Sequence, residues 1–91
     1  MASSTLQKTN VIATLINNDS ITVRIKFVAH IIIYREAFSH FAEYVVDYKG
    51  GVKALTNDAS FTVTTQGDYP AVDVTVTSLI GQSASVLITY V

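Results

Sequence analysis

The sequence predicts a mainly β protein, folded as a single-domain two-sheet β-sandwich or jelly roll. Apolar and polar side chains alternate in several short stretches, which is the pattern of strands with one buried face. Clusters of Gly, Asn, Asp and Pro separate these stretches at roughly the 8–12-residue spacing that is typical of sandwiches and small barrels. The length of 91 residues allows one domain, which we place over residues 10–91.

Residues 1–9 are small and polar, and we interpret them as an N-terminal arm that reaches a neighbouring subunit. The first strand is expected at 10–16. It is followed by Asn17-Asn18-Asp19, residue types that accept a positive φ and bond to their own backbone. We expect this turn to form a hairpin with the stretch that follows.

The stretch 20–34 is the longest apolar-rich run in the chain. In its first half Ile21, Val23 and Ile25 alternate with polar residues, whereas around 31–33 both faces are apolar. A strand with these properties must either lie centrally in a sheet or bridge two sheets.

Residues 35–49 fit two structures. Phe38, Phe41 and Val45 recur at helical spacing ahead of Gly50, while Tyr44 and Val46 favour a strand. We expect one helix near 36–48, with the strand as the alternative. Further strands are expected at 52–55, 59–64, 72–77 and 84–91, each bounded by turn residues.

The composition is unusual for a small monomer and points to assembly. Charged residues make up 14%, against roughly 25% in typical domains, and hydrophobic residues make up 49%. A surface poor in charge is weakly protected against edge-to-edge association. The six basic residues are interleaved with acids at a net charge of −1, so we expect no nucleic-acid partner.

The chain has no apolar run of about 20 residues, so we expect no membrane span. It also lacks the basic and apolar regions of a classical signal peptide. We therefore expect it in a virion or in an extracellular surface assembly that is reached by another route.

Little in the sequence suggests catalysis, a metal or a cofactor, and we assign no residue to any of these roles. There is no Cys, so disulfides and thiolate metal ligands are excluded. We expect His30 to be a buried imidazole bonded to the backbone. On a helix, Ser39 or His40 would share a face with Glu43, but no G-x-S-x-G motif accompanies them. The isolated Asp residues lack the spacing of a calcium loop.

The last third of the chain resembles the small jelly-roll subunits of bacterial endospore appendages. The resemblance covers 57–91 and rests on Asn57-Asp58-Ala59-Ser60-Phe61-Thr62-Val63, on the Thr/Val-rich stretch 72–77 and on Ile88-Thr89-Tyr90. It implies subunits whose sheets extend one another and whose N-terminal arm reaches a neighbour. The N-terminal cysteines that crosslink subunits of that family are absent here.

We therefore expect a structural, self-assembling subunit of an extracellular fibre or of a virion, working as a homo-oligomer or within a larger protein assembly. A phage capsid-decoration (cement) or tail protein fits about as well. The alternative from another class is a monomeric binding module that holds a ligand in the sandwich end loops 17–19 and 66–69.

Overall fold

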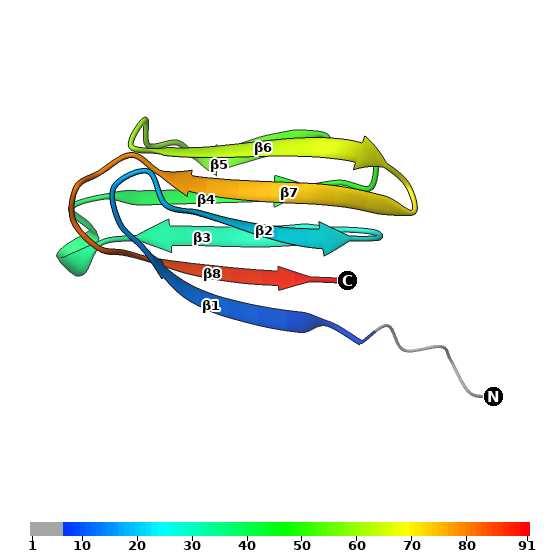
Figure 1. The fold of residues 1–91 in the computed structure, drawn as a ribbon, viewed down its shortest axis with the longest axis horizontal. Helices are drawn as coiled ribbons and strands as arrows, with labels where there is room; N and C mark the ends of the chain where they lie inside the picture. The colour runs from blue at the N-terminus through cyan, green and yellow to red at the C-terminus, as the bar shows by residue number, and fades with distance from the viewer. Residues whose placement is uncertain (1–6) are drawn as a thin grey trace.

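The computed structural model describes residues 7–91, which form two antiparallel sheets packed face to face (Figure 1). The strands are β1 (Thr9–Leu15), β2 (Ser20–Ile25), β3 (Ala29–Tyr34), β4 (Phe41–Val46), β5 (Val52–Thr56), β6 (Phe61–Asp68), β7 (Ala71–Ser78) and β8 (Ala84–Tyr90). One sheet has the order β1-β8-β3-β4-β5 and the other β2-β7-β6. The predicted β-sandwich is confirmed. Residues 1–6 of the predicted arm lie outside the described residues, and Thr9 already belongs to β1.

The long apolar run bridges the two sheets, which is one of its two predicted arrangements. Its first half is β2 in the three-stranded sheet, and its second half is β3 in the five-stranded sheet. The crossover is held by Val91, whose carbonyl accepts hydrogen bonds from Phe27 N at 2.9 Å and Lys26 N at 3.2 Å. Val91 N also donates to Val28 O at 3.1 Å. The two halves of the run belong to different sheets, and this explains why the apolar pattern changes halfway along it.

The predicted hairpin between the first two strands is wrong. Asn17 and Asn18 do adopt positive φ, at 23° and 67°, as expected of a tight turn. However, β1 pairs with β8 and β2 pairs with β7, so the turn carries the chain from one sheet to the other. The backbone N–H groups of Asn17 and Asn18 donate to Ile80 O and Ser78 O, each at 2.7 Å. These hydrogen bonds hold the turn against the end of β7 and the residues that follow it. A hairpin turn between β1 and β2 would not need them.

The predicted helix near 36–48 is also wrong. A single short 3₁₀ turn (Glu36–Phe38) is followed by β4, and Ala37 has a φ of 54°, which ends any helix. In β4 the side chains of Ala42, Tyr44 and Val46 are buried, with 0%, 5% and 0% exposure, at the period of two that defines a strand.

The core lies between the two sheets and is built from aliphatic side chains of alternate strand positions. The largest side chains with almost no exposure are Ile25, Ile31, Ile33, Val46, Val72, Val74, Val76, Val86 and Ile88. Tyr44 in the five-stranded sheet donates its hydroxyl to Phe61 O of β6 in the other sheet, at 3.5 Å. The phenol is therefore buried in the core, and this burial raises the pKa of Tyr44, with a smaller contribution from the charge of Asp58.

Candidate interaction surface

The outer face of the three-stranded sheet is polar and makes its own hydrogen bonds. The outward-facing side chains in register are Ser20, Thr22, Arg24, Thr62, Thr64, Gln66, Asp73, Thr75 and Thr77. Hydroxyl pairs link β2 to β7 at 2.8 Å (Ser20 to Thr77) and 2.9 Å (Thr22 to Thr75). Arg24 Nε donates to Asp73 Oδ1 at 2.8 Å, and this bond lowers the pKa of the Asp73 carboxyl. This face is suited to contact with water.

The outer face of the five-stranded sheet is different, because apolar side chains cross it. The strand register places Ile12, Leu87 and Ile32 side by side in one row across β1, β8 and β3. Ile12 is 80% exposed, the highest value among the exposed large hydrophobic side chains of the described chain. In the next row Tyr34 of β3, which is 40% exposed, lies opposite Phe41 of β4. We call Ile12, Leu87, Ile32, Tyr34 and Phe41 the apolar face.

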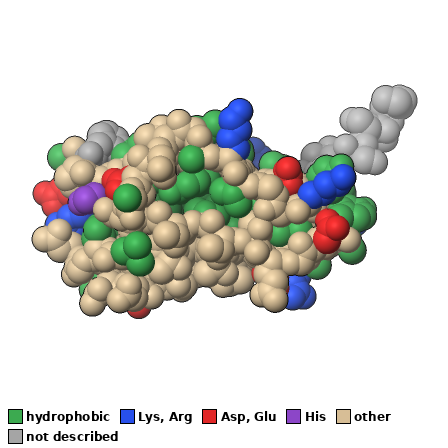
Figure 2. All heavy atoms as spheres, turned by 90° about the horizontal axis from the view of Figure 1, so that it is seen from above, with side chains coloured by type: hydrophobic (Ala, Val, Ile, Leu, Met, Phe, Trp, Pro, Cys, Tyr) green, Lys and Arg blue, Asp and Glu red, His purple; other side chains and the backbone are tan. Residues whose placement is uncertain are grey.

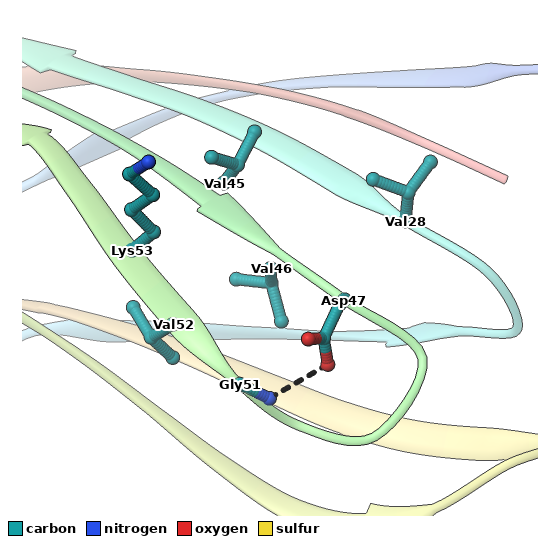
Figure 3. Close-up of a pocket in the computed structure, with 7 residues that line it drawn as sticks. All are labelled: Val28, Val45, Val46, Asp47, Gly51, Val52 and Lys53. Carbon is teal, nitrogen blue, oxygen red and sulfur yellow. Dashed lines mark hydrogen bonds between the residues drawn. The ribbon is translucent and has the colours of Figure 1, made fainter.

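A shallow groove of about 360 Å³ lies beside the apolar face, toward the β4–β5 turn (Figure 3). It is lined by Val28, Val45, Val46, Asp47, Gly51, Val52 and Lys53. The Asp47 carboxylate accepts hydrogen bonds from Gly51 N at 2.8 Å and Lys49 N at 2.9 Å, so it stabilises the β4–β5 turn. The remaining lining is mostly valine, which extends the apolar character of this side of the sheet.

His30 lies on the same outer face, and the prediction that it is a buried imidazole bonded to the backbone is wrong. Its Nε2 lies 2.6 Å from Glu43 Oε2 on the neighbouring strand, and the two side chains are 43% and 28% exposed. Its outward position follows from the strand period, since Ala29 and Ile31 on either side are fully buried. The His30–Glu43 pair borders the apolar face, because Glu43 lies opposite Ile32.

The second histidine belongs to a separate cluster of hydrogen bonds. His40 Nδ1 lies 3.2 Å from Asp58 Oδ2 and 3.1 Å from Ser60 Oγ. Asp58 also accepts hydrogen bonds from Ser60 N at 2.9 Å and Phe41 N at 3.2 Å. The pKa of Asp58 is lowered, chiefly by the hydrogen bond from Ser60 N. The cluster fixes the turn before β6 to the start of β4.

Although this cluster contains Ser, His and Asp, its geometry differs from that of a catalytic triad. In a triad the acid and the nucleophile contact opposite nitrogens of the imidazole, so that the base can relay a proton. Here Asp58 and Ser60 share Nδ1. Glu43, which a helix would have placed beside His40, pairs with His30 instead. The arrangement therefore supports a structural role.

The two loops considered for ligand binding lie at opposite ends of the sandwich. Ser20, just after the first loop, pairs with Thr77, whereas the second loop adjoins Asp68, which pairs with Ala71 at the other end of β7. A ligand cannot be held by both loops together. Within residues 7–91, no group of three or more His, Asp or Glu side chains is placed to hold a metal ion. No helix in the described range is long and apolar enough to cross a membrane.

The edge of the sandwich formed by β5 and β6 also exposes apolar side chains. Hydrophobic atoms gather in the middle of this edge, with basic and acidic groups toward its ends (Figure 2). Leu55 is 51% exposed and Val52 39% exposed, and every residue of β5 is exposed. The five-stranded sheet is therefore less covered at this end.

Comparisons with protein-family models, with curated proteins and with solved structures gave no match.

Proposed function

We propose that this chain is a structural, self-assembling subunit of an extracellular fibre or of a virion. The observation that carries the proposal is the contrast between the two outer faces. The three-stranded sheet presents hydroxyl and charged groups, whereas the five-stranded sheet presents Ile12, Leu87 and Ile32 in one row. Apolar patches on soluble domains commonly mark protein–protein contacts.

The composition supports the same proposal. Charged side chains are only 14% of the sequence, and Glu43, which lies opposite Ile32, is within hydrogen-bond distance of His30. Protein–protein interfaces are depleted in charge at their centre and enriched in aromatic side chains. The apolar face contains two such side chains, Tyr34 and Phe41. The resemblance of 57–91 to endospore appendage subunits supports a fibre. A phage capsid-decoration or tail protein is the alternative within the same class.

The size of the apolar face sets what kind of contact it can make. The whole outer face of the five-stranded sheet, with strands about 4.8 Å apart and six residues at about 3.3 Å each, spans a flat area of roughly 480 Å², and the apolar face is only part of it. A stable interface of standard size buries about 800 Å² per partner. The face of one subunit therefore supports a weak contact, and stable assembly requires repetition or a second contact.

Self-assembly can be tested by light scattering on a sizing column over a range of concentrations, with negative-stain electron microscopy of the largest species. We expect defined oligomers, rings or fibres whose share grows with concentration. Ile32→Lys places a charge in the apolar face and should shift the distribution toward monomer. Thr75→Lys adds the same charge to the polar face and is the matched control. A wild-type chain that remains a monomer near 9.9 kDa at all concentrations would overturn the proposal in favour of a monomeric binding module.

A further inference from the structure

We propose that two copies of this chain pair through β1, edge to edge and antiparallel about a two-fold axis at Ile12. This inference rests on the proposed function and names the first contact of the assembly. Among the described residues 7–91, β1 is the last strand at one edge of the five-stranded sheet, beside β8 (Figure 1). An edge strand presents backbone N–H and C=O groups that a second strand can bind.

The β1 edge lacks the features that usually prevent such pairing. It is seven residues long and contains no charge, proline or glycine. Its pairing with β8 runs from Thr9 to Leu15 without a bulge, so the strand is regular along its whole length. Ile12, the most exposed of the large hydrophobic side chains noted above, lies at its centre. A long, uncharged and regular edge of this kind is expected to pair with another strand.

The other edges carry protection. β5 is shorter, contains Lys53 and has a register shift opposite Glu43 and Tyr44. The middle of β6 is bonded to the β4–β5 turn, because Thr65 Oγ1 donates to Gly50 O at 2.7 Å. β2 carries the exposed guanidinium of Arg24. Charges, bulges and covering segments are the means by which proteins block unwanted strand addition. Among the edge strands of the two sheets in residues 7–91, β1 is the one without such protection, so we place the pairing there.

The sequence of β1 suits pairing with itself. With Ile12 opposite Ile12 of the second copy, all seven residues are paired, which no other two-fold register achieves. Asn10 then faces Thr14 of the other copy on the outer side, and Val11 faces Ala13 on the inner side. In these central pairs polar residues meet polar residues and apolar residues meet apolar ones, as stable cross-strand pairs require, whereas Thr9 faces Leu15 at the two ends.

Such pairing would enlarge the outer face, which in a single subunit supports only a weak contact. Two five-stranded sheets would join into one sheet of ten strands. The row Ile32–Leu87–Ile12 would continue into the same row of the second copy, and the outer face of the joined sheet, which contains this row, would span a flat area of roughly 1,000 Å². That area exceeds the 800 Å² or so that a standard interface takes from one partner. The dimer, rather than the single chain, would then be the unit whose apolar face contacts the next unit of the assembly.

The absence of Cys allows a direct test of this register by single-cysteine crosslinking of the full chain under mild oxidation. Residues directly opposite in an antiparallel pair have Cβ atoms about 4.5–5.5 Å apart. We expect Ile12→Cys to form a disulfide-linked dimer. Asn10→Cys alone should not, because position 10 faces position 14 of the other copy, whereas the double variant Asn10→Cys/Thr14→Cys should. Crosslinking of Asn10→Cys alone as efficiently as Ile12→Cys would overturn the register.

A second measurement does not depend on cysteine. Ile12→Lys places two like charges directly opposite each other in the dimer, and we expect the dimer dissociation constant to rise about tenfold or more. Leu55→Lys adds the same charge to the β5 edge and should leave dimerisation unchanged. Circular dichroism of both variants checks that the fold is retained.

The outcomes separate this inference from the proposed function. Assembly that survives Ile12→Lys but is lost in Ile32→Lys would refute pairing through β1 and leave the structural function standing. A dimer that crosslinks through Ile12→Cys, survives Ile32→Lys and is lost in Ile12→Lys, but never grows larger, would support β1 pairing and refute the fibre or virion role. A wild-type chain that stays monomeric refutes both.

Discussion

Asp58 should be one of the most sensitive polar positions in the chain, and Asp58→Ala tests this. Its carboxylate accepts hydrogen bonds from Ser60 N, Phe41 N and His40 Nδ1 at 2.9, 3.2 and 3.2 Å, and its side chain is only 20% exposed. Hydrogen bonds to a charged group contribute about 1.5–3 kcal/mol each. They are not additive, and water will reach the freed donors, so we expect a total loss of about 2–4 kcal/mol.

This loss is large for a domain of this size. At about 0.05–0.15 kcal/mol per residue, the whole chain has a stability of roughly 5–14 kcal/mol. Each kcal/mol shifts the melting temperature by about 4–8 °C in domains of this length, so Asp58→Ala should melt about 8–32 °C lower. The assays are thermal and urea unfolding at low protein concentration, followed by far-UV circular dichroism and by tyrosine fluorescence, since the chain has five Tyr and no Trp.

The matched control is Asp68→Ala. Asp68 also accepts a backbone hydrogen bond, from Tyr69 N at 2.8 Å, but at an exposed position. Its loss should change the free energy of unfolding by less than about 0.5 kcal/mol. If Asp58→Ala costs no more stability than Asp68→Ala, the Asp58 carboxylate does not hold β4 and the β5–β6 turn together.

The pH dependence of stability gives an independent check on Asp58. Its pKa is lower in the folded chain than in the unfolded chain, so the ionised carboxylate stabilises the fold above the unfolded pKa of about 3.9. This contribution disappears as the pH falls through the folded pKa. Asp58→Asn should therefore lose less stability than the wild-type chain on acidification below about pH 4, whereas an unchanged acid profile would contradict the assignment.

Two further predictions concern the core. Ser78 is fully buried in β7, and its Oγ has no hydrogen-bond partner among the described residues, so Ser78→Ala should raise the free energy of unfolding by about 1 kcal/mol in urea titrations; a loss of stability would contradict this. The pKa of Tyr44 is raised by burial, so the folded chain resists ionisation of this phenol and should lose stability as the pH rises above about 10. Tyr44→Phe should remove this alkaline loss at a cost of about 0.5–1.5 kcal/mol at neutral pH, measured by denaturant unfolding at both pH values.

The sequence predicted what depends on local pattern and missed what depends on distant partners. The positive φ values of Asn17 and Asn18 follow from residue type, so the turn was predicted correctly. The strands that this turn joins could not be paired from the sequence, since β1 pairs with β8 and β2 with β7, both far away along the chain. The same limit applies to His30, whose partner Glu43 is set by the register of β3 and β4.

The failure of the predicted helix has a more specific cause, and it bears on function. A strand with one wet face would have had polar residues at 41, 43 and 45, and its period of two would have been clear. Instead Phe41 and Val45 are apolar and point outward, and with the buried Ala42 they imitate helical spacing. Phe41 and Val45, which make this strand resemble a helix in the sequence, belong to the apolar face and to the groove beside it. A sequence that departs from the simple pattern of its own fold is expected to do so where function requires it. The apolar outer positions of β4 therefore support the interpretation that this side of the sheet is made to contact another protein surface.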